Sequence, residues 1–173
     1  MRKGFTLLEV VIAVSVVSVG LVGALLLITR TVSQMNLFSS RLIASYLSQE
    51  GIEIVRNIRD TNWLEQATDP SVLWDEGLNT PACLAGCEAD YITGSANDTI
   101  PLKPTLPAYG TGRLLKIDND GFYNYSTVTD TRFKREITIV PTATTLTVTV
   151  ETTWTEKAKS YSHKAQEVLY NWK

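Results

Sequence analysis

One carboxylate interrupts the longest apolar run of the chain. The run extends from Phe5 to Ile28, and Glu9 lies near its start, shortly after the basic pair Arg2 and Lys3. An ionised carboxylate in the apolar part of a membrane helix costs roughly 2.5 to 3.5 kcal/mol on insertion scales. A charge in such a place indicates a function and needs a partner of opposite charge. Glu9 is therefore the first candidate functional residue.

The apolar run is long enough to cross a membrane. About 20 apolar residues span the ~30 Å hydrocarbon core of a bilayer, whereas the apolar part of a cleavable signal usually has about 7 to 15. Arg2 and Lys3 precede the run and only Arg30 follows it closely. This distribution of positive charge predicts a cytoplasmic N-terminus and places the rest of the chain outside.

Three ordinary explanations compete for this run. A cleaved signal peptide would need a small-residue site such as Ala-x-Ala at its end, and no such site closes the run. A plain membrane anchor explains the length and the flanking charges but not the cost of Glu9. A buried helix of a soluble protein would rarely be so continuously apolar. None of the three gives Glu9 a role.

The residues around Glu9 resemble a known signal. Lys3-Gly4-Phe5-Thr6-Leu7-Leu8-Glu9 is similar to the type III signal of type IV pilins and pseudopilins. The resemblance implies that a prepilin peptidase cuts between Gly4 and Phe5 and methylates the new amino terminus at Phe5. It also implies that Glu9 attracts the positive terminal amine of a neighbouring subunit during assembly.

The same resemblance implies a set of partners and a location. Besides the prepilin peptidase, the expected partners are other pilin subunits, in a homo- or hetero-polymer, an inner-membrane assembly platform and membrane lipid. The protein would be a single-pass membrane protein with a cytoplasmic N-terminus and an extracytoplasmic head. After assembly it would lie in a pilus or pseudopilus at the cell surface.

The chain of 173 residues divides by composition into five segments. We expect a leader at 1–4, a transmembrane and assembly helix at 5–29, an amphipathic helix of the head at 30–60, a variable Pro-rich loop at 61–112 and an antiparallel sheet at 113–173. Apolar residues recur at helical spacing to about Arg59, and no proline precedes Pro70. Five of the six prolines then fall between Thr68 and Gly110.

Alternation of apolar and polar residues predicts the sheet. Leu146, Val148 and Val150 alternate with threonines, which is typical of a strand with one buried face. A similar pattern precedes it at 132–140, and a further strand is expected at 160–170 after a turn at 156–159. The apolar face must cover something, and the amphipathic stripe from Leu42 to Ile58 is the obvious candidate. The predicted fold is pilin-like α+β, a long N-terminal helix packed on a C-terminal antiparallel sheet.

Gly51 lies within the predicted amphipathic helix, where it costs about 1 kcal/mol relative to alanine. We expect it to allow a strand to approach the helix closely. Gly20 and Gly23 would suit packing in a filament core. Arg56 and Asp60 have the spacing of an ion pair on one helix face.

The chain has two cysteines, Cys83 and Cys87, both in the Pro-rich loop. An outward-facing chain lies in an oxidising compartment, so we predict that the pair forms a disulfide worth about 2 kcal/mol or less. A zinc site is disfavoured because it needs four ligands and the single histidine, His163, is far away in sequence. Many type IV pilins place a disulfide near the C-terminus instead, so the adhesive function of that region is not carried over.

Asp118, Asp120 and Asn124 surround a predicted hairpin turn at Asn-Asp-Gly. Their oxygens could serve calcium, which takes six to eight such ligands. The turn itself explains these residues more simply, because Asp and Asn bond their own backbone and the terminal glutamate of an EF-hand is absent.

No catalytic constellation emerges from the sequence, so we predict no enzyme and no cofactor or metal. Basic residues are scattered, and the formal net charge is −2, so no nucleic-acid partner is predicted. The sequence is interpreted as a prepilin-type structural subunit that polymerises through its hydrophobic helix. The alternative is a minor tip or membrane-anchored binding module that uses the Pro-rich loop for adhesion or partner recognition.

Overall fold

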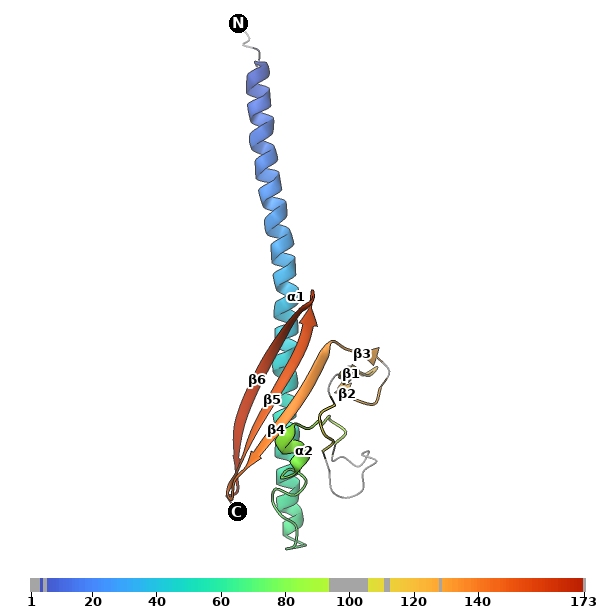
Figure 1. Cartoon of the computed structure of the whole chain (residues 1–173). Coiled ribbons are helices and arrows are strands. Elements are labelled where there is room, and N and C mark those ends of the chain that lie inside the picture. The colour runs from blue at the N-terminus through green and yellow to red at the C-terminus, as the bar shows by residue number, and fades with distance from the viewer. Residues whose placement is uncertain (1–3, 5, 94–105, 111–112, 128, 173) are drawn as a thin grey trace. The chain divides into compact units, whose positions relative to one another are not determined.

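The computed structural model describes residue 4 and residues 6–93, 106–110, 113–127 and 129–172. The chain forms two compact units, Met1–Ser40 and Arg41–Lys173. Among the described residues, the second unit contains the last part of the long N-terminal helix, a short second helix and strands β1 to β6 (Figure 1). In chain order the elements are α1 (Leu7–Gln66), α2 (Pro81–Ala85), β1 (Lys116–Ile117), β2 (Tyr123–Asn124), β3 (Thr129–Asp130), β4 (Phe133–Pro141), β5 (Thr145–Glu156) and β6 (Lys159–Tyr170).

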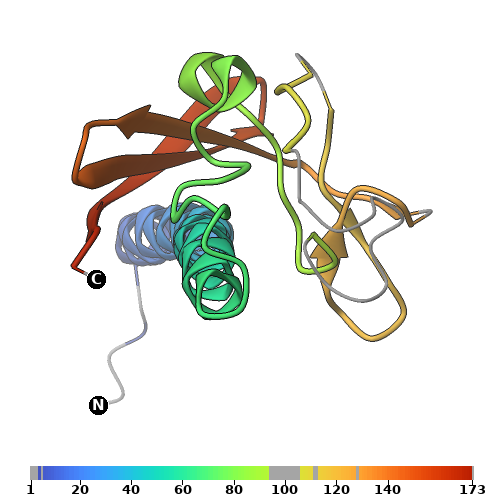
Figure 2. The same ribbon diagram turned by 90° about the horizontal axis from the view of Figure 1, so that it is seen from below.

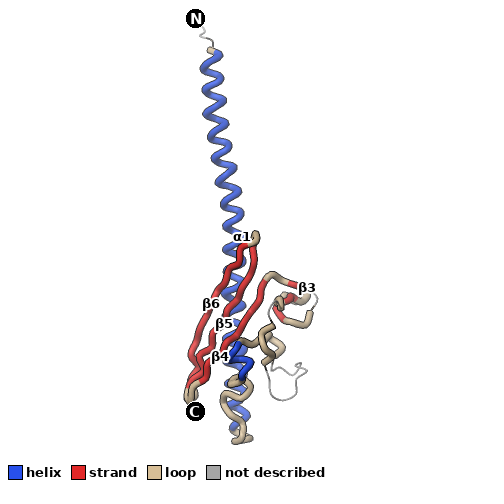
Figure 3. The backbone as a smooth tube through the Cα atoms, in the orientation of Figure 1, coloured by secondary structure: helices blue, strands red, loops and turns tan. Residues whose placement is uncertain are grey.

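The main sheet of the second unit is an antiparallel meander in the order β4-β5-β6. Its strands lie side by side in Figure 3. Ile137, Val150 and Ala165 are opposite one another across the three strands. Residues alternate between buried and more exposed along β4 and β5. The predicted α+β fold with an antiparallel sheet is confirmed.

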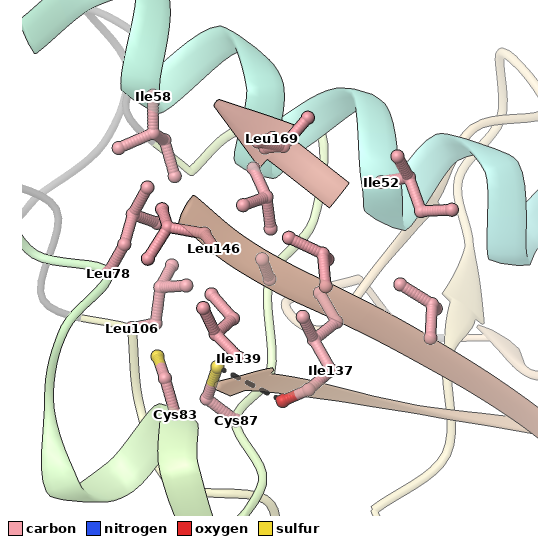
Figure 4. Close-up of a cluster of buried hydrophobic side chains, with 14 of the residues drawn as sticks. Ile52, Ile58, Leu78, Cys83, Cys87, Leu106, Ile137, Ile139, Leu146 and Leu169 are labelled. Atoms are coloured by element: carbon pink, nitrogen blue, oxygen red, sulfur yellow. Dashed lines mark hydrogen bonds between the residues drawn. The ribbon is translucent and has the colours of Figure 1, made fainter. Parts of the chain in front are cut away.

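The core lies between this sheet and the part of α1 that follows Ser40. Seen along the helix, this part lies under one face of the sheet (Figure 2). Ile52, Val55 and Ile58 of α1 meet Val148 and other apolar side chains of the strands. The buried cluster also includes residues of the intervening segment, namely Trp74, Leu78, Cys83, Cys87, Ala89 and Leu106. Figure 4 labels four of them, Leu78, Cys83, Cys87 and Leu106.

Gly51 lies where the strands come closest to the helix. A Cβ atom at this position would lie 2.9 Å from Cγ1 of Val150 and 3.2 Å from Cδ of Arg135. The expectation that Gly51 permits a close approach of the sheet is confirmed. Gly20 and Gly23 have nothing within 4 Å of the corresponding Cβ position, so their packing role remains a prediction.

Helix α1 ends later than predicted, at Gln66 instead of about Arg59. The last turns are held by tertiary contacts. The side-chain amide of Asn62 donates to the carbonyl oxygens of Trp74, at 3.2 Å, and Glu76, at 2.9 Å. Such contacts between distant segments favour helix beyond the point where the sequence pattern becomes weak.

Two further details differ from expectation. Arg56 does not form its ion pair with Asp60 but with Glu53 and with Glu167 of β6. The Asp60 carboxylate instead accepts from Arg59. The predicted pair is wrong because a strand carries a carboxylate to Arg56, which spacing along the helix cannot reveal.

The predicted hairpin around Asn-Asp-Gly is present as β1 and β2, joined through a turn in which Gly121 has a φ of 90°. A third short strand, β3, has no counterpart in the sequence prediction and pairs with the other side of β1. Within the expected loop, α2 also forms. Its N-cap Thr80 accepts a hydrogen bond from the amide of Cys83, and proline occupies the first turn, as is common for helix starts.

Candidate functional site

The candidate site begins at the N-terminus of α1. Met1, Arg2, Lys3 and Phe5 lie outside the described residues, and Gly4 is exposed. The structure therefore describes Gly4, the residue before the predicted cleavage site, but not Phe5, the predicted methylation site. Nothing lies within 4 Å of the point that a Cβ atom at Gly4 would occupy, so packing places no demand on the size of this residue.

Thr6 is the N-cap of α1. Its hydroxyl oxygen accepts a hydrogen bond from the amide of Glu9 at 3.3 Å, and its carbonyl oxygen accepts from the amides of Glu9 and Val10. Thr6-Leu7-Leu8-Glu9 has the spacing of a capping box. The cap places Glu9 in the first helical turn, where the positive end of the helix dipole favours a carboxylate.

The cap is an ordinary structural role for the Thr6 hydroxyl and the backbone amide of Glu9. It satisfies backbone amides that have no partner within the helix. It does not require the carboxylate to lie in an otherwise apolar run, since a cap is normally found at a water-exposed helix end. The cap explains where Glu9 is held, while the surrounding apolar residues leave its charge to be balanced by another group.

The apolar part of α1 is exposed within its own unit. Leu7 is 84 % exposed and Val19 is 75 % exposed, and no residue of the apolar window is buried. Among the described residues, α1 is one helix that is long and apolar enough, by length and composition, to cross a membrane. Apolar surface of this extent is stable in lipid or against other chains but not in water.

Hydroxyl groups within the apolar helix are satisfied by the helix itself. Ser15 donates to the carbonyl oxygen of Ile12 and Ser18 donates to that of Val14, both at 2.8 Å. Thr29 and Thr31 bond carbonyl oxygens one turn earlier in the same way. These local bonds reduce the cost of placing hydroxyls in hydrocarbon. Glu9 differs from them because its charge cannot be neutralised by a carbonyl group.

A buried arginine fixes the head sheet on its helix. The side chain of Arg135 in β4 is fully buried and donates to the carbonyl oxygen of Leu47 and to the Glu50 carboxylate, both at 3.0 Å. It also donates to the carbonyl oxygen of Ala89, at 2.5 Å. The arginine therefore connects α1, β4 and the segment after α2.

The alternation of β4 contains a signal for this buried arginine, although the sequence prediction did not single it out. Arg135 alternates with Phe133 and Ile137, so it lies on the apolar face of the strand. An arginine at such a position is buried only with good partners. Glu88 was also missed. It is buried, accepts from Arg113 and from the amide of Gly110, and burial raises the pKa of its carboxyl group.

A smaller polar contact links α1 to β5 and β6. The hydroxyls of Ser48 and Thr152 are 2.9 Å apart, and Nδ1 of His163 lies 3.4 Å from the Ser48 hydroxyl. Ser48 also donates to the carbonyl oxygen of Ala44. Because Ser48 is completely buried, this cluster joins helix to sheet and offers no accessible nucleophile.

The candidate calcium residues form a turn. One oxygen of the Asp118 carboxylate accepts from the amides of Asp120 and Phe122, and the other accepts from the hydroxyl of Tyr91 at 3.0 Å. The Phe122 amide contributes most to lowering the pKa of Asp118. Among the described residues no group of three or more His, Cys, Asp or Glu side chains is arranged to hold a metal ion.

The two cysteines are close together and buried. Their sulfur atoms lie 2.7 Å apart and are not bonded, so the predicted disulfide is not shown. Sγ of Cys87 also lies 3.3 Å from the carbonyl oxygen of Ile137, drawn as a dashed line in Figure 4. The structure thus brings the predicted pair together without the covalent bond.

A comparison with protein families identifies the N-terminal segment. Residues 1–25 match the family described as Prokaryotic N-terminal methylation motif, which is typical of type IV pilins and pseudopilins. The motif supports the predicted structural role. Searches of curated proteins and of solved structures found no match to the chain.

The match and the fold together define a prepilin-like protein. The chain has the N-methylation motif and a hydrophobic N-terminal helix. Its second unit has the helix and antiparallel sheet of a pilin-like α+β head. Among the sequence-predicted residues, Gly4, Phe5 and Glu9 fall within the matched segment, whereas Cys83 and Cys87 belong to the head.

Proposed function

We propose that this chain is a structural subunit that is processed after Gly4 and polymerises through its hydrophobic N-terminal helix into a type IV pilus or pseudopilus. The observation that carries the proposal is the methylation motif at residues 1–25, which continues into an exposed apolar helix. An apolar helix that finds no partner in its own unit requires lipid before assembly and other chains after it.

Processing changes the charge at the start of this helix. Cleavage between Gly4 and Phe5 removes Arg2 and Lys3 and leaves a positive amine at Phe5, which N-methylation retains. In a subunit interface of low dielectric, that amine and the Glu9 carboxylate of a neighbour attract far more strongly than in water. Assembly thereby neutralises a charge that a single subunit carries at a cost.

The partners follow from this function. A prepilin peptidase removes the leader, an inner-membrane assembly platform receives the membrane-anchored subunit, and other pilin subunits surround the helix in the polymer. Membrane lipid covers the helix before assembly. The head, which holds the sheet, lies on the extracytoplasmic side and then at the surface of the pilus or pseudopilus.

The assembly role of Glu9 is tested by Glu9→Ala in the native host. We expect the variant to be processed like the natural chain but to fall at least about tenfold in a sheared-filament fraction, because its helix can no longer neutralise a neighbour's amine. A matched control is Glu65→Ala, which removes an exposed carboxylate from the head part of the same helix. It should assemble normally. Normal filaments from Glu9→Ala would contradict the role.

The alternative function, a minor tip or membrane-anchored binding module, depends on the Pro-rich loop. Residues 94–105 and 111–112 of that loop lie outside the described residues, and no observation favours a binding role for the others. The alternative would be supported if the chain were scarce in filaments and if binding to a surface or partner were lost on deletion of the loop.

A further inference from the structure

The two cysteine sulfurs occupy an apolar site between α2 and β4. Both residues are completely buried, and both belong to the hydrophobic cluster that holds the head together. A disulfide bond is about 2.05 Å long, so a movement of about 0.7 Å would join the two sulfurs. We propose that Cys83 and Cys87 form a disulfide in the exported head, and that the resulting ring clamps the segment that covers the edge of β4.

The clamped segment, which ends at Cys87, extends the sheet beyond β4. The amide of Cys87 donates to the carbonyl oxygen of Ile137 at 2.8 Å, and the amide of Ile137 donates back to Cys87 at 2.9 Å. On its other side Cys87 pairs with Ala108. Both pairings are isolated bridges instead of long ladders. The cover therefore depends on few hydrogen bonds.

The cover matters because an open strand edge pairs with other chains. The amides and carbonyl groups of β4 that face away from β5 would be a template for unwanted pairing. Cys87 satisfies the central part of this edge at Ile137. A covalent ring that ends at Cys87 holds the cover at the residue where it meets the strand.

Gly86 increases the conformational entropy that the segment loses on folding when the ring is absent. Its φ is 122°, a conformation that residues other than glycine rarely adopt, and a Cβ atom there would collide with the carboxylate of Glu136. Glycine is thus required, and glycine loses more conformational freedom on folding than other residues. Closing Cys83 to Cys87 around it restricts the unfolded segment and reduces this loss.

The oxidation requires an acceptor, for which we propose an exported carrier protein with an exchangeable disulfide. A thiolate of the pair, for example that of Cys83, attacks one sulfur of the carrier and releases the first carrier thiolate. The Cys87 thiolate then attacks the Cys83 sulfur of the mixed disulfide and releases the second. The two thiols of the head lose two electrons and two protons, and the carrier disulfide becomes a dithiol.

Neither cysteine is exposed in the folded head, so exchange with the carrier must precede the final packing of α2 against β4. Once packed, the ring is protected from reductants.

The disulfide is tested on the full chain from membranes of the native host. The chain is denatured with iodoacetamide present, and the peptide that contains both cysteines is weighed. We expect no alkylated cysteine before reduction and two after reduction in denaturant, whereas reductant applied to the folded protein should leave the ring intact. Two alkylated cysteines before reduction would overturn the proposal. The disulfide rests on the extracytoplasmic head of the proposed function, but neither result depends on filament assembly, so the disulfide and the polymerisation can fail separately.

The clamping role is tested by hydrogen exchange on the Cys83→Ser, Cys87→Ser double variant. We expect the Ile137 amide to exchange at least about tenfold faster than in the natural chain, with the Val150 amide in the centre of the sheet as an unchanged control. Unchanged protection of Ile137 would overturn the clamp. If the serine variant does not fold, Cys83→Ala with Cys87→Ala removes the ring and keeps an apolar site.

Discussion

At the scale of single residues, Gly51 shows how a strand determines a helical residue. A helix interior favours alanine over glycine by about 1 kcal/mol. At position 51 this preference conflicts with contact, because a Cβ atom would lie 2.9 Å from a methyl group of Val150. The branched side chain of Val150 is fully buried and has little room to move. Contact with the sheet outweighs helix propensity at this position.

We therefore predict that Gly51→Ala destabilises the head by about 1 to 2 kcal/mol, since crowding of a packed core costs more than the helix gains. Gly23→Ala on the same helix is the control, because nothing lies within 4 Å of its Cβ position. Urea unfolding of the detergent-solubilised chain, followed by tryptophan fluorescence, measures both. An equally stable Gly51→Ala head would mean that the sheet does not press on the helix.

At the scale of elements, Arg135 holds β4, α1 and the segment after α2 together. Its side chain is fully buried, whereas that of its ionic partner Glu50 remains 33 % exposed. Two carbonyl oxygens, of Leu47 and Ala89, accept its remaining hydrogen bonds. Removing the arginine would leave the two carbonyl oxygens without their donor and the partly exposed Glu50 carboxylate without its ionic partner.

Arg135→Ala is expected to cost the head about 3 kcal/mol or more, the lower end of the range for breaking a buried ion pair because Glu50 retains some water. Lys134→Ala, one residue earlier on the opposite face of the strand, should change the stability by less than about 0.5 kcal/mol. The same urea titration compares them. Equal effects of the two substitutions on the free energy of unfolding would show that the contacts of Arg135 do not stabilise the head.

The elements also show what the sequence could predict. Alternation around Val148 and Val150 predicted the main sheet, because a strand with one buried face has a period of two residues. The end of α1 and the partner of Arg56 were predicted wrongly, and β3 was not predicted, for a different reason. Each depends on contacts between distant segments, such as Asn62 with the carbonyl of Trp74 or Arg56 with Glu167.

The residues of the candidate site also divide into those that the sequence could predict and those that it could not. The motif from Lys3 to Glu9 is local, so its residues could be read directly from the sequence. A disulfide between Cys83 and Cys87 was predicted from the expected oxidising compartment, and the structure places their sulfurs 2.7 Å apart without the bond. Nothing in the sequence indicated that Glu88 is buried, because its burial depends on Arg113 and on the amide of Gly110, which come from a later segment.

At the scale of the whole molecule, the two units differ in what covers their apolar side chains. The head unit buries its own core, whereas the apolar residues of the first unit are exposed. A protein of this kind is stable only when lipid or other subunits cover that helix. The methylation motif supports other subunits as the final cover, and cleavage after Gly4 is the step that we expect to prepare the helix for them.

The most direct test of the proposed function is mass spectrometry of the N-terminal peptide, taken from native membranes and from a sheared-filament fraction. We predict that the peptide from the sheared fraction begins at Phe5 and carries one methyl group on its amine. Gly4→Asp, at a position with open space around it, should retain the uncleaved leader in membranes. A natural chain that keeps Met1 to Gly4 in every fraction would contradict the proposal and leave a membrane-anchored domain instead.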